Sequence, residues 1–526
     1  MRTGLSKDLI ARVLGAAPKY TLDELEAKFP ARNLADGAMV TRFAPSPTGY
    51  MHLGNLYSAL ISYKLAQQSN GVFLLRIENT DTKRENKEAV DVIINSLAEF
   101  GITYENDPTY GPYYQSERKD IYHSVAADLL ARGLAYPCFL TQEEMDEIRE
   151  NQKAAGFATG IYGEWARDRD LSEEEIIAYL DRGLVPSIRL YSMGNPEQRI
   201  FCKDAVRGSI SVPEHNEDTV LIKSTDGLPT YHFAHLCDDH FMHTTHVVRD
   251  ESYFGTFAMH VQMFRMMGWN LPAYVHIATL DKIDEETGKQ RKLSKRKDPE
   301  ANVAFFLEAG WPVESVIEYL GNILAPGYEE SKMKGAVKSF WDYEMRPKKM
   351  PVSGSLFDMK KLEWWAKEFI GALPVPELVA RVVTWANEYG TDVNKMQVAD
   401  VKYLTGVLGI ERDNPKRVRK DFITWSQTLE NVAFFWDDLF VPNTEYEFNR
   451  DALKAFLETY NPTDDKDTWW AKIVAIAESV GVKNGDVAMN LRVALSGRTN
   501  TPDLYSIMSV MGGERVKQRV QNAIKA

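Results

Sequence analysis

Residues 39–55 read MVTRFAPSPTGYMHLGN and contain the clearest structural pattern in this chain. The first part of this stretch, residues 39–44, is apolar and includes β-branched side chains, which predicts a strand. Residues 45–49 predict a sharp turn, because the prolines cannot donate hydrogen bonds and glycine accepts a positive φ. From Leu53 the apolar residues recur at helical spacing, which predicts a helix that ends at Asn70-Gly71.

The next element is a near-continuous apolar run at residues 72–78, typical of a strand buried on both faces of a sheet. Strand, turn, helix and strand in this order predict a right-handed βαβ unit with parallel strands. The polar residues 79–81 then predict the start of a second helix, which reaches about Phe100. The beginning of the chain therefore has the pattern of an α/β domain.

The start of the first predicted helix favours a nucleotide. A helix N-terminus carries N–H groups without helical partners and a partial positive charge, so it attracts a phosphate. His52 and Asn55 add side-chain donors, and Gly54 lets a bulky group approach the backbone. Parallel sheets place such sites at the carboxyl ends of their strands. On these residues alone, a plain turn with a histidine cap stays open as an alternative.

The composition is that of a large globular chain. With 526 residues, of which 44 % are hydrophobic, it predicts roughly three or four domains with buried cores. The net charge of −13 argues against indiscriminate nucleic-acid binding, although local basic patches can still contact RNA. Three cysteines form no disulfide framework, so we expect a cytoplasmic location. We expect no membrane span and no signal peptide, because no sufficiently long apolar run occurs.

The middle of the chain allows two interpretations. Residues 219–223 and 229–234 flank the dipeptide Asp226-Gly227, which predicts a β-hairpin. Half of the ten histidines lie between His232 and His246, so a histidine-rich metallohydrolase remains a remote alternative. We expect no metal there, because ligands on strands would alternate between the two faces of the sheet.

A strongly charged segment, residues 281–297, follows the last predicted strand; we call it the clamp loop. Its acidic side chains precede a turn at Gly288, and its basic side chains follow that turn. One interpretation is a solvated surface loop. The other is a clamp in which Lys292, Lys295 and Arg296 neutralise a phosphate chain as negative charge develops on it.

Taken together, these stretches resemble the bacterial-type glutamyl-tRNA synthetases, a family of class I aminoacyl-tRNA synthetases. The resemblance extends from about residue 40 to residue 526 and depends on the joint order and spacing of several motifs. The matching stretches are RFAPSPTG at 42–49, HLGN at 52–55 (the HIGH-type element), RIENTD at 76–81, YH at 231–232, DDH at 238–240, Arg249, KLSKR at 292–296 (the KMSKS-type loop), and the segments 491–497 and 513–516.

The resemblance implies a two-step reaction on three substrates: ATP with Mg²⁺, L-glutamate and tRNA-Glu. Glutamate attacks the α-phosphate to form glutamyl-adenylate, and the terminal ribose of the tRNA then takes the acyl group. The resemblance also implies a monomer without a membrane partner. It implies that the catalytic residues are His52, Lys292 and Lys295; that ATP binds at Ser46, His52, Gly54, Asn55, Lys292, Leu293, Ser294, Lys295 and Arg296; and that glutamate binds at Arg42, Ala44, Ser46, Glu78, Tyr231 and Arg249.

In this scheme Arg249 and Arg42 bind the side-chain carboxylate of the substrate, and Glu78 binds its ammonium group. A guanidinium fork suits a carboxylate and offers glutamine's amide no ion pair. Charge-assisted hydrogen bonds contribute roughly 1.5–3 kcal/mol each. Two of them would separate glutamate from glutamine by roughly two orders of magnitude or more.

The fold class implied is α/β: a Rossmann-like parallel-sheet catalytic domain, split by an α+β insertion and followed by all-α anticodon-binding domains. Residues 1–37 lie outside the resemblance and predict a helical packing extension. The expected domains are the extension 1–37, the first catalytic half 38–117, the inserted acceptor-stem-binding domain 118–230, the second catalytic half 231–280, the clamp loop with a stem-contact domain 281–364, and the anticodon-binding domains 365–526.

Several positions depart from the family pattern. Some relatives hold a cysteine-ligated zinc in the insertion, but Cys138 has no second cysteine nearby, so we expect no structural zinc. His235 stands where asparagine is usual, and Tyr253 stands where tryptophan is common. The sequence leaves open whether tRNA-Gln is charged as well. A glutaminyl enzyme, a short relative without the helical tail and a catalytically inactive adaptor fit these motifs less well.

Overall fold

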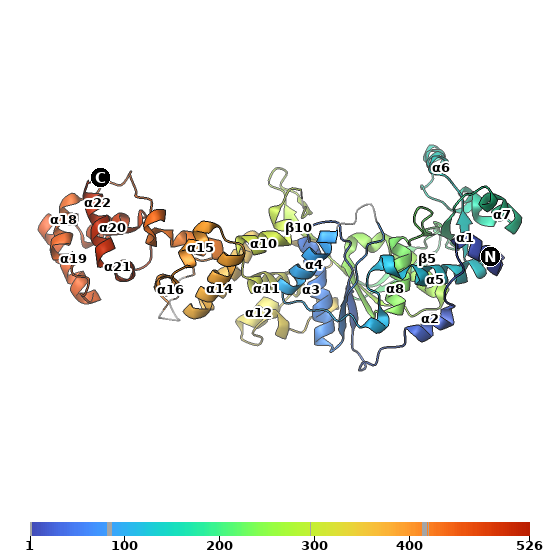
Figure 1. Cartoon of the computed structure of the whole chain (residues 1–526), viewed down its shortest axis with the longest axis horizontal. Coiled ribbons are helices and arrows are strands. Elements are labelled where there is room, and N and C mark those ends of the chain that lie inside the picture. Colours follow the sequence, from blue (N-terminus) through green and yellow to red (C-terminus); the bar gives the residue numbers. More distant parts are fainter. Residues whose placement is uncertain (1–2, 82–86, 295, 413–417, 419, 526) are drawn as a thin grey trace. The chain divides into compact units, whose positions relative to one another are not determined.

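The computed structural model describes residues 3–81, 87–294, 296–412, 418 and 420–525 (Figure 1). They form two compact units. The first unit contains Met1–Val303 and Leu320–Phe357, and the second contains Ala304–Tyr319 and Asp358–Ala526. Every described residue of the predicted ATP and glutamate sites lies in the first unit.

The predicted βαβ unit is present. It consists of β1 (Val40–Phe43), α3 (Leu53–Gln68) and β2 (Val72–Leu75), and the two strands are parallel. Between α3 and β2 the backbone at Gly71 passes close to Met39. A Cβ atom at this position would lie only 2.0 Å from the carbonyl oxygen of Met39. Only glycine admits this close backbone approach.

A second sheet continues the first. Its strand order is β6-β5-β9-β8, with β8, β9 and β5 parallel and β6 antiparallel. β1 lies beside β8, because the N–H of Thr245 donates to the carbonyl oxygen of Val40 at 2.9 Å. A hairpin from the predicted insertion thus extends the catalytic sheet. The strands are β5 (Arg199–Asp204), β6 (Gly208–Pro213), β8 (His246–Asp250) and β9 (Ala273–Ile277).

Helices cover both faces of the sheet next to β1 (Figure 1). Thr41 Oγ1 donates to the carbonyl oxygen of Ser62 on α3 at 2.7 Å, whereas Arg42 Nε donates to Asp239 Oδ1 on α8 (Tyr231–Phe241) at 3.0 Å. Successive side chains of a strand point to opposite faces, so α3 and α8 lie on opposite sides of β1. This burial on both faces explains the apolar runs in the sequence.

The prediction of a hairpin at residues 219–234 is wrong in its second arm. A turn does follow β7 (Val220–Ile222), where the N–H of Lys223 donates to the carbonyl oxygen of Leu228 at 3.0 Å. The chain then forms α8 from Tyr231 onward instead of a strand. Most side chains of α8 are buried, so the helix has no continuous polar face and its sequence lacks the usual helical pattern.

The second predicted helix is present, within the described residues, as α4 (Lys87–Glu99). Residues 79–81 are not helical. The side chain of Asn79 donates to Ser116 Oγ at 2.9 Å and accepts from the N–H of Ser116 at 3.0 Å. Asn79 therefore ties this segment to a neighbouring loop instead of capping a helix.

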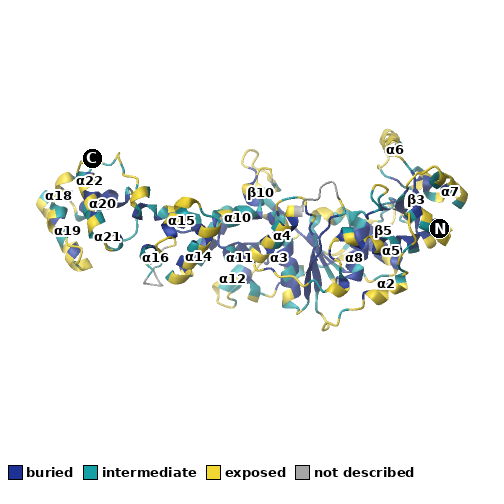
Figure 2. Cartoon of the chain, viewed as in Figure 1, coloured by how far each residue is buried: buried dark blue, intermediate teal, exposed yellow. Residues whose placement is uncertain are grey.

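The predicted insertion contains a three-stranded antiparallel sheet and three helices, and the N-terminal helices pack beside it. Leu9 of α1 and Leu25 of α2 are buried in one apolar core with α5, α8 and α9. The capping box of Thr21 and Glu24 is confirmed, and Figure 2 shows that α6 is largely exposed. The elements are α1 (Lys7–Leu14), α2 (Leu22–Lys28), α5 (Lys119–Ala131), β3 (Ala135–Cys138), α6 (Gln142–Ala154), α7 (Glu173–Asp181), β4 (Ser187–Leu190) and α9 (Phe257–Met267).

The clamp loop begins as a hairpin of β10 (Leu280–Ile283) and β11 (Gln290–Lys292). Gly288 has a φ of 66° in the turn, as its position between the two charge runs predicts. β12 (Ser355–Leu356) pairs with β10, and α12 (Tyr328–Met333) belongs to the same unit.

The second unit is helical, which confirms the prediction for the C-terminal part. Its core contains the buried aromatic residues Trp385, Trp425 and Phe456. The helices from residue 303 onward, apart from α12, are α10 (Val303–Ala309), α11 (Val313–Leu324), α13 (Met359–Ala372), α14 (Val375–Glu388), α15 (Asp392–Val398), α16 (Val401–Gly409), α17 (Trp425–Asn431), α18 (Arg450–Thr459), α19 (Lys466–Val480), α20 (Asn484–Ser496), α21 (Leu504–Met511) and α22 (Gly513–Lys525).

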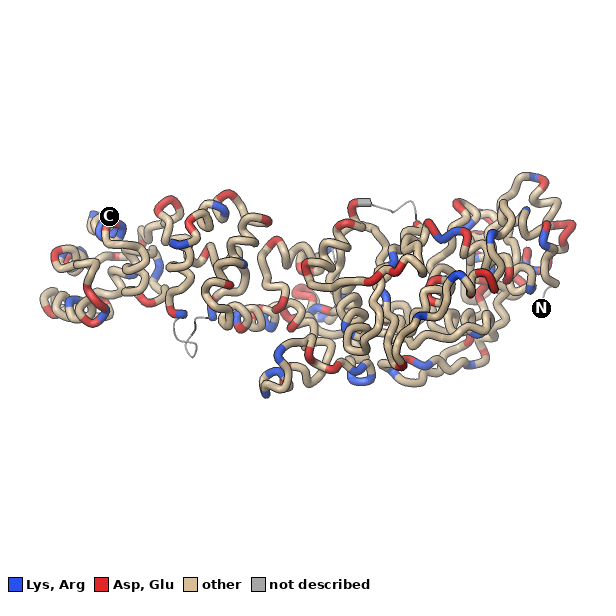
Figure 3. The backbone as a smooth tube through the Cα atoms, turned by 60° about the horizontal axis from the view of Figure 1, so that its bottom comes forward, with Lys and Arg blue, Asp and Glu red and all other residues tan. Residues whose placement is uncertain are grey.

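Basic and acidic residues are interspersed along each unit (Figure 3). In the part of the chain that the structure describes, no helix is long and apolar enough to cross a membrane.

Candidate active site

Three segments leave the sheet at the carboxyl ends of neighbouring strands. They follow β1, β2 and β8; the first two carry predicted site residues, and Arg249 lies within β8 itself. Ser46 from the first segment and Glu78 from the second line one cavity of about 520 Å³, together with Tyr231 at the start of α8. The structure therefore brings half of the predicted glutamate-binding residues to one hollow, at the edge where parallel sheets bind ligands.

Arg249 near the end of β8 is the most constrained of these residues. It is only 5 % exposed, and its Nε donates to His276 Nε2 at 2.9 Å. Its Nη1 donates to His260 Nδ1 at 3.0 Å, and its guanidinium carbon lies 4.6 Å from the ring centre of Tyr274. Nη2 is buried and has no hydrogen-bond partner among the described residues. A buried donor without a partner is costly, so this atom suits an incoming acceptor.

Arg42 and Arg76 share the carboxylate of Asp239. Arg76 Nη1 lies 2.7 Å from Asp239 Oδ1, and Arg42 Nε lies 3.0 Å from the same oxygen. Burial alone would raise the pKa of Asp239, but the two guanidinium groups hold that pKa well below its usual range. The negative charge of Asp239 thus neutralises part of the positive charge behind the cavity.

Glu78 is 9 % exposed, and its Oε1 lies 3.2 Å from Arg76 Nη2. Burial raises the pKa of Glu78 to about 7, against the opposing effect of Arg76 and Arg42. A cation that enters the cavity would favour the ionised carboxylate. Burial likewise raises the pKa of Tyr231 to about 12, so its hydroxyl is neutral at physiological pH.

The predicted ATP residues His52, Gly54 and Asn55 lie at the start of α3. His52 is the N-cap of this helix, and its Nδ1 accepts the N–H of Gly54 at 2.9 Å. In a neutral imidazole the hydrogen then lies on Nε2. Asn55 is exposed in the first turn, and Ala44 is half-buried directly after β1. α3 is long enough for the partial positive charge at its N-terminus to attract a phosphate.

The clamp loop reaches the carboxyl end of β8. Lys292 Nζ lies 3.0 Å from Asp250 Oδ2, and Asp250 directly follows Arg249. Leu293 is buried, and its N–H donates to the carbonyl oxygen of Leu280 at 2.9 Å.

A backbone hydrogen bond stabilises the next part of the clamp loop. The N–H of Ser294 donates to Asp298 Oδ2 at 2.8 Å, whereas the side chain of Arg296 is exposed. Lys295 lies outside the described residues. Asn302, which follows the loop, forms a β-bridge with His52, so the loop and the start of α3 are neighbours.

The prediction that the histidines at residues 232–246 alternate between the two faces of a strand is wrong, because several of them lie on the helix α8. His232 and His235 lie one turn apart on α8 and both contact His260 of α9, with ring centres 5.2 and 4.5 Å away. The positive charge of Arg249 acts on all three imidazoles and opposes a metal cation there. Within the described ranges, no three histidine, cysteine or acidic residues are grouped so that they could hold a metal ion.

The two departures from the family pattern lie beside Arg249. His235 Nε2 lies 2.8 Å from the hydroxyl of Tyr274, and His235 Nδ1 lies 2.5 Å from Asp239 Oδ2. His235 therefore links Tyr274, whose ring contacts Arg249, to Asp239, whose carboxylate contacts Arg42. The ring of Tyr253 lies 5.7 Å from the guanidinium carbon of Arg249 and is half-exposed.

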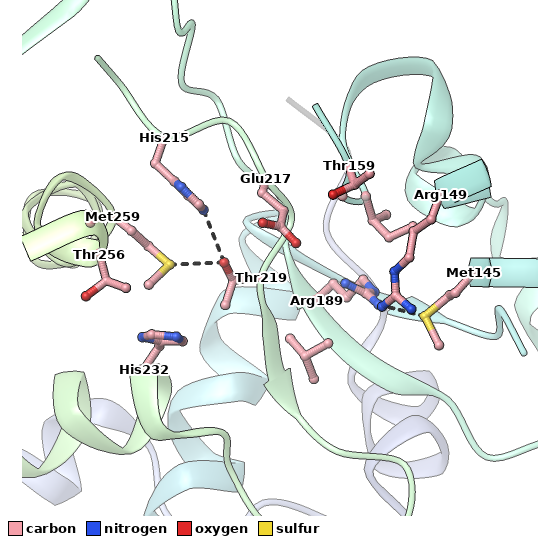
Figure 4. A pocket seen from close by; sticks show the side chains of 14 residues that line it. Met145, Arg149, Thr159, Arg189, His215, Glu217, Thr219, His232, Thr256 and Met259 are labelled. Carbon is pink, nitrogen blue, oxygen red and sulfur yellow. Dashed lines mark hydrogen bonds between the residues drawn. The ribbon is translucent and has the colours of Figure 1, made fainter. Parts of the chain in front are cut away.

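A second cavity, of about 580 Å³, is lined by His232 (Figure 4). Its wall also includes Arg189 of β4 and Met259 of α9, so it lies between the insertion and helices α8 and α9. The sequence did not predict this cavity. It also did not predict the contacts of His260 and His276, although one signal was present: His276 is a polar residue within the apolar run of β9.

Comparisons with known proteins agree with this architecture. A family model described as "tRNA synthetases class I (E and Q), catalytic domain" matches residues 38–364. A second model, "Anticodon binding domain", matches residues 378–524. These matches cover most of the first unit and the C-terminal helices.

Two curated relatives have the name Glutamate--tRNA ligase. One, from Clostridium perfringens (strain 13 / Type A), is 41 % identical over 548 residues, which cover 98 % of this chain and 99 % of the relative. The other, from Acetivibrio thermocellus, is 42 % identical over 525 residues, which cover 94 % of this chain and 95 % of the relative. The first alignment also includes most of residues 1–37, so the extension is shared with that relative.

Among solved structures, this chain is similar to a glutamate tRNA ligase from Elizabethkingia meningosepticum, crystallised in complex with its amino acid. The TM-score is 0.76 at 27 % identity, and the match covers 93 % of this chain and 99 % of that chain. A second structure, from Elizabethkingia anophelis, gives a TM-score of 0.75.

Proposed function

Since this chain belongs to the class I tRNA synthetases for glutamate and glutamine and is a glutamate–tRNA ligase, we propose a role in the reaction for each of its site residues. The enzyme uses ATP to attach L-glutamate to tRNA-Glu for protein synthesis. The observation that carries the proposal is the buried Nη2 of Arg249, which has no hydrogen-bond partner among the described residues. The charge of Arg249 acts on Tyr231, which lines one cavity together with Glu78.

We propose that Arg249 binds the side-chain carboxylate of the substrate and Glu78 its ammonium group. Arg249 offers a donor that is already desolvated, which favours a charged acceptor over a neutral amide. Ser46 and Tyr231 line this cavity, and the charge of Arg42 acts on Tyr231 in its wall. Ala44, directly after β1, would contact the substrate from the same segment as Ser46. The positive Arg249 at one end of the site and the negative Glu78 at the other would bind glutamate in a single orientation.

ATP is the second substrate, and its triphosphate suits the start of α3. We propose that the N–H groups there and the side chains of His52 and Asn55 contact the phosphates, with Gly54 allowing close approach. Lys292, with Lys295 and Arg296, would neutralise the pyrophosphate as it leaves. Mg²⁺ would enter with ATP and be held mainly by phosphate oxygens and water, since the described residues contain no ligand cluster.

The chemistry then follows from position and charge. A carboxylate oxygen of glutamate forms a bond to the α-phosphorus as the bond to the β-phosphate oxygen breaks, giving glutamyl-adenylate and pyrophosphate. A ribose hydroxyl of the tRNA next attacks the acyl carbon, and AMP leaves. The protein supplies orientation and charge stabilisation rather than a covalent nucleophile.

The tRNA would contact several parts of the chain. The anticodon-binding model covers α14 to α22, so we propose that these helices bind the anticodon arm and that the insertion binds the acceptor stem. We further propose that the enzyme acts as a cytoplasmic monomer. Whether it also glutamylates tRNA-Gln depends on anticodon contacts and remains an alternative within the same function.

The proposal is tested by pyrophosphate exchange and aminoacylation with the intact chain. Exchange in the presence of tRNA-Glu should require L-glutamate, and L-glutamine should be at least about a hundredfold poorer as a substrate. Parallel assays with purified tRNA-Glu and tRNA-Gln measure the breadth of tRNA use. Equal exchange with glutamate and glutamine would contradict the proposed role of Arg249.

A further inference from the structure

Arg249 is held between two histidines from different elements of the first unit. Arg249 Nε donates to Nε2 of His276 on β9 at 2.9 Å, and Arg249 Nη1 donates to Nδ1 of His260 on α9 at 3.0 Å. A guanidinium group has hydrogens on every nitrogen and no acceptor. Both histidines must therefore accept hydrogen bonds, and an accepting ring nitrogen carries no hydrogen.

Each histidine has a partner that fixes the position of its hydrogen. His276 Nδ1 lies 2.8 Å from Asp204 Oδ2, which can only accept, so the hydrogen of His276 lies on Nδ1. His260 Nε2 lies 3.1 Å from His232 Nδ1, so the hydrogen of His260 lies on Nε2 and points to His232. Asp204 belongs to β5, so the hairpin of the insertion stabilises the arrangement around Arg249.

The surroundings keep both histidines neutral. His260 and His276 are fully buried, and burial lowers the pKa of each. Arg249 lowers both pKa values further, because a positive imidazolium would face a positive guanidinium. The other charged or titratable groups that act on this pair are Asp204 and Arg207 beside His276, and His232, His235 and Asp239 beside His260.

We propose that His276 and His260 are positioning residues that fix the direction in which Arg249 presents its remaining donors to substrate. The two histidines accept from Nε and from one hydrogen of Nη1, and the buried Nη2 has no partner among the residues that the structure describes. The inference rests on the proposed role of Arg249 in glutamate binding. Rotation of the guanidinium plane would break both bonds, so the donor left for the carboxylate keeps one orientation.

The residues that surround His276 allow a conservative test. The rings of Phe254 and Phe257 lie 5.2 and 4.8 Å from its ring, so His276→Phe keeps an aromatic side chain in an aromatic environment. Asp204 still accepts the backbone N–H groups of Val206 and Arg207 in that variant. His276→Gln retains an acceptor for Arg249. The matched control is His246→Phe on β8, because His246 bonds to Thr245 and not to Arg249.

The readout is steady-state aminoacylation with tRNA-Glu and ATP at saturation. His276→Phe should raise the KM for glutamate at least about tenfold and leave kcat and the KM for ATP within about twofold, as expected when uniform substrate binding is lost. His276→Gln should restore most of the glutamate affinity, and His246→Phe should behave as wild type. A purely structural role would move both KM values, kcat and thermal stability together, without rescue by glutamine.

Two further measurements keep the inference open to refutation if His276→Phe does not fold. His260→Phe tests the other nitrogen with the same expected result. In ¹⁵N-histidine spectra of the wild-type protein, His276 should be neutral with its hydrogen on Nδ1; a cationic ring or a hydrogen on Nε2 would overturn the inference. If Arg249→Ala loses glutamate affinity while a folded His276→Phe does not, only the positioning role fails. If Arg249→Ala has no effect, the proposed glutamate site fails instead.

Discussion

Lys292 Nζ lies 3.0 Å from Asp250 Oδ2, and Asp250 directly follows Arg249 at the carboxyl end of β8. This ion pair joins the clamp loop to the strand that carries the proposed glutamate-binding arginine. Lys292 is half-exposed, so the pair contributes little to stability. Its position places a movable ammonium group beside the carboxyl end of the sheet, where the reaction would occur.

Lys292→Ala should slow glutamate activation. The ammonium group of Lys292 would stabilise charge that develops on the leaving pyrophosphate, and removal of one such donor costs roughly a hundredfold in kcat. The measurement is tRNA-dependent pyrophosphate exchange. Lys289→Ala is the matched control, because Lys289 is an exposed lysine in the same hairpin. An equal loss in both variants would indicate a nonspecific charge effect.

The KM for glutamate should depend on pH through Glu78. Glu78 must be ionised to bind the substrate ammonium group, and its pKa is raised to about 7 by burial. The KM should therefore rise as the pH falls below about 7, approaching tenfold per pH unit. Glu78→Gln should have a high KM that no longer follows this profile. A wild-type KM that stays constant between pH 6 and pH 8 would contradict the assignment.

The same pKa predicts a stability effect. Because the folded-state pKa of Glu78 lies above its ordinary value of 4.5, the folded protein binds more protons than the unfolded chain between those values. As the pH rises from 4.5 to about 7, ionisation of Glu78 should lower the free energy of unfolding by about 3 kcal/mol in total. Glu78→Gln should therefore raise the melting temperature at pH 8 and have little effect at pH 4.5.

The N-terminal extension should be a structural part of the first unit. Leu25 of α2 is fully buried in the core that includes α5 and α8. Leu25→Ala should destabilise this unit by about 2–5 kcal/mol, which thermal and urea unfolding can measure. Leu34→Ala is the control, since Leu34 is exposed and should change stability by less than about 0.5 kcal/mol. Equal effects would show that α2 does not pack as described.

Purified protein should contain far less than one zinc ion per chain. Cys138 is buried, and burial raises the pKa of its thiol, whereas a metal-bound cysteine must ionise. EDTA should stop aminoacylation only by removing Mg²⁺ from ATP, so added Mg²⁺ alone should restore activity. Stoichiometric zinc in metal analysis, or a need for zinc in recovery, would contradict the expectation of no structural zinc.

The sequence predicted the elements that depend on local chemistry. The helix from Leu53 and the parallel strands β1 and β2 follow from glycine and apolar spacing within one short stretch. The turn at Gly288 followed in the same way. Local patterns failed at α8, where burial on all sides removes the polar face that marks a helix.

The sequence could not predict contacts between distant segments. Asp204 and His276 are 72 residues apart, and Arg249 meets His276 across 27 residues, so only the folded sheet brings them together. The motif resemblance identified Arg249 but gave no sign of the histidines that hold it. Asp239 was visible as part of a motif, yet its two arginine partners depend on the packing of α8 against β1.

The most direct test of the central claim is aminoacylation of purified tRNA-Glu with L-glutamate by wild-type protein and by Arg249→Ala, measured side by side. Arg265→Ala serves as the control, because Arg265 is an exposed arginine on α9. We predict that the wild type forms glutamyl-tRNA, that Arg265→Ala equals it, and that Arg249→Ala raises the KM for glutamate by about ten- to a hundredfold while remaining folded. An unchanged KM for glutamate in folded Arg249→Ala would contradict the account.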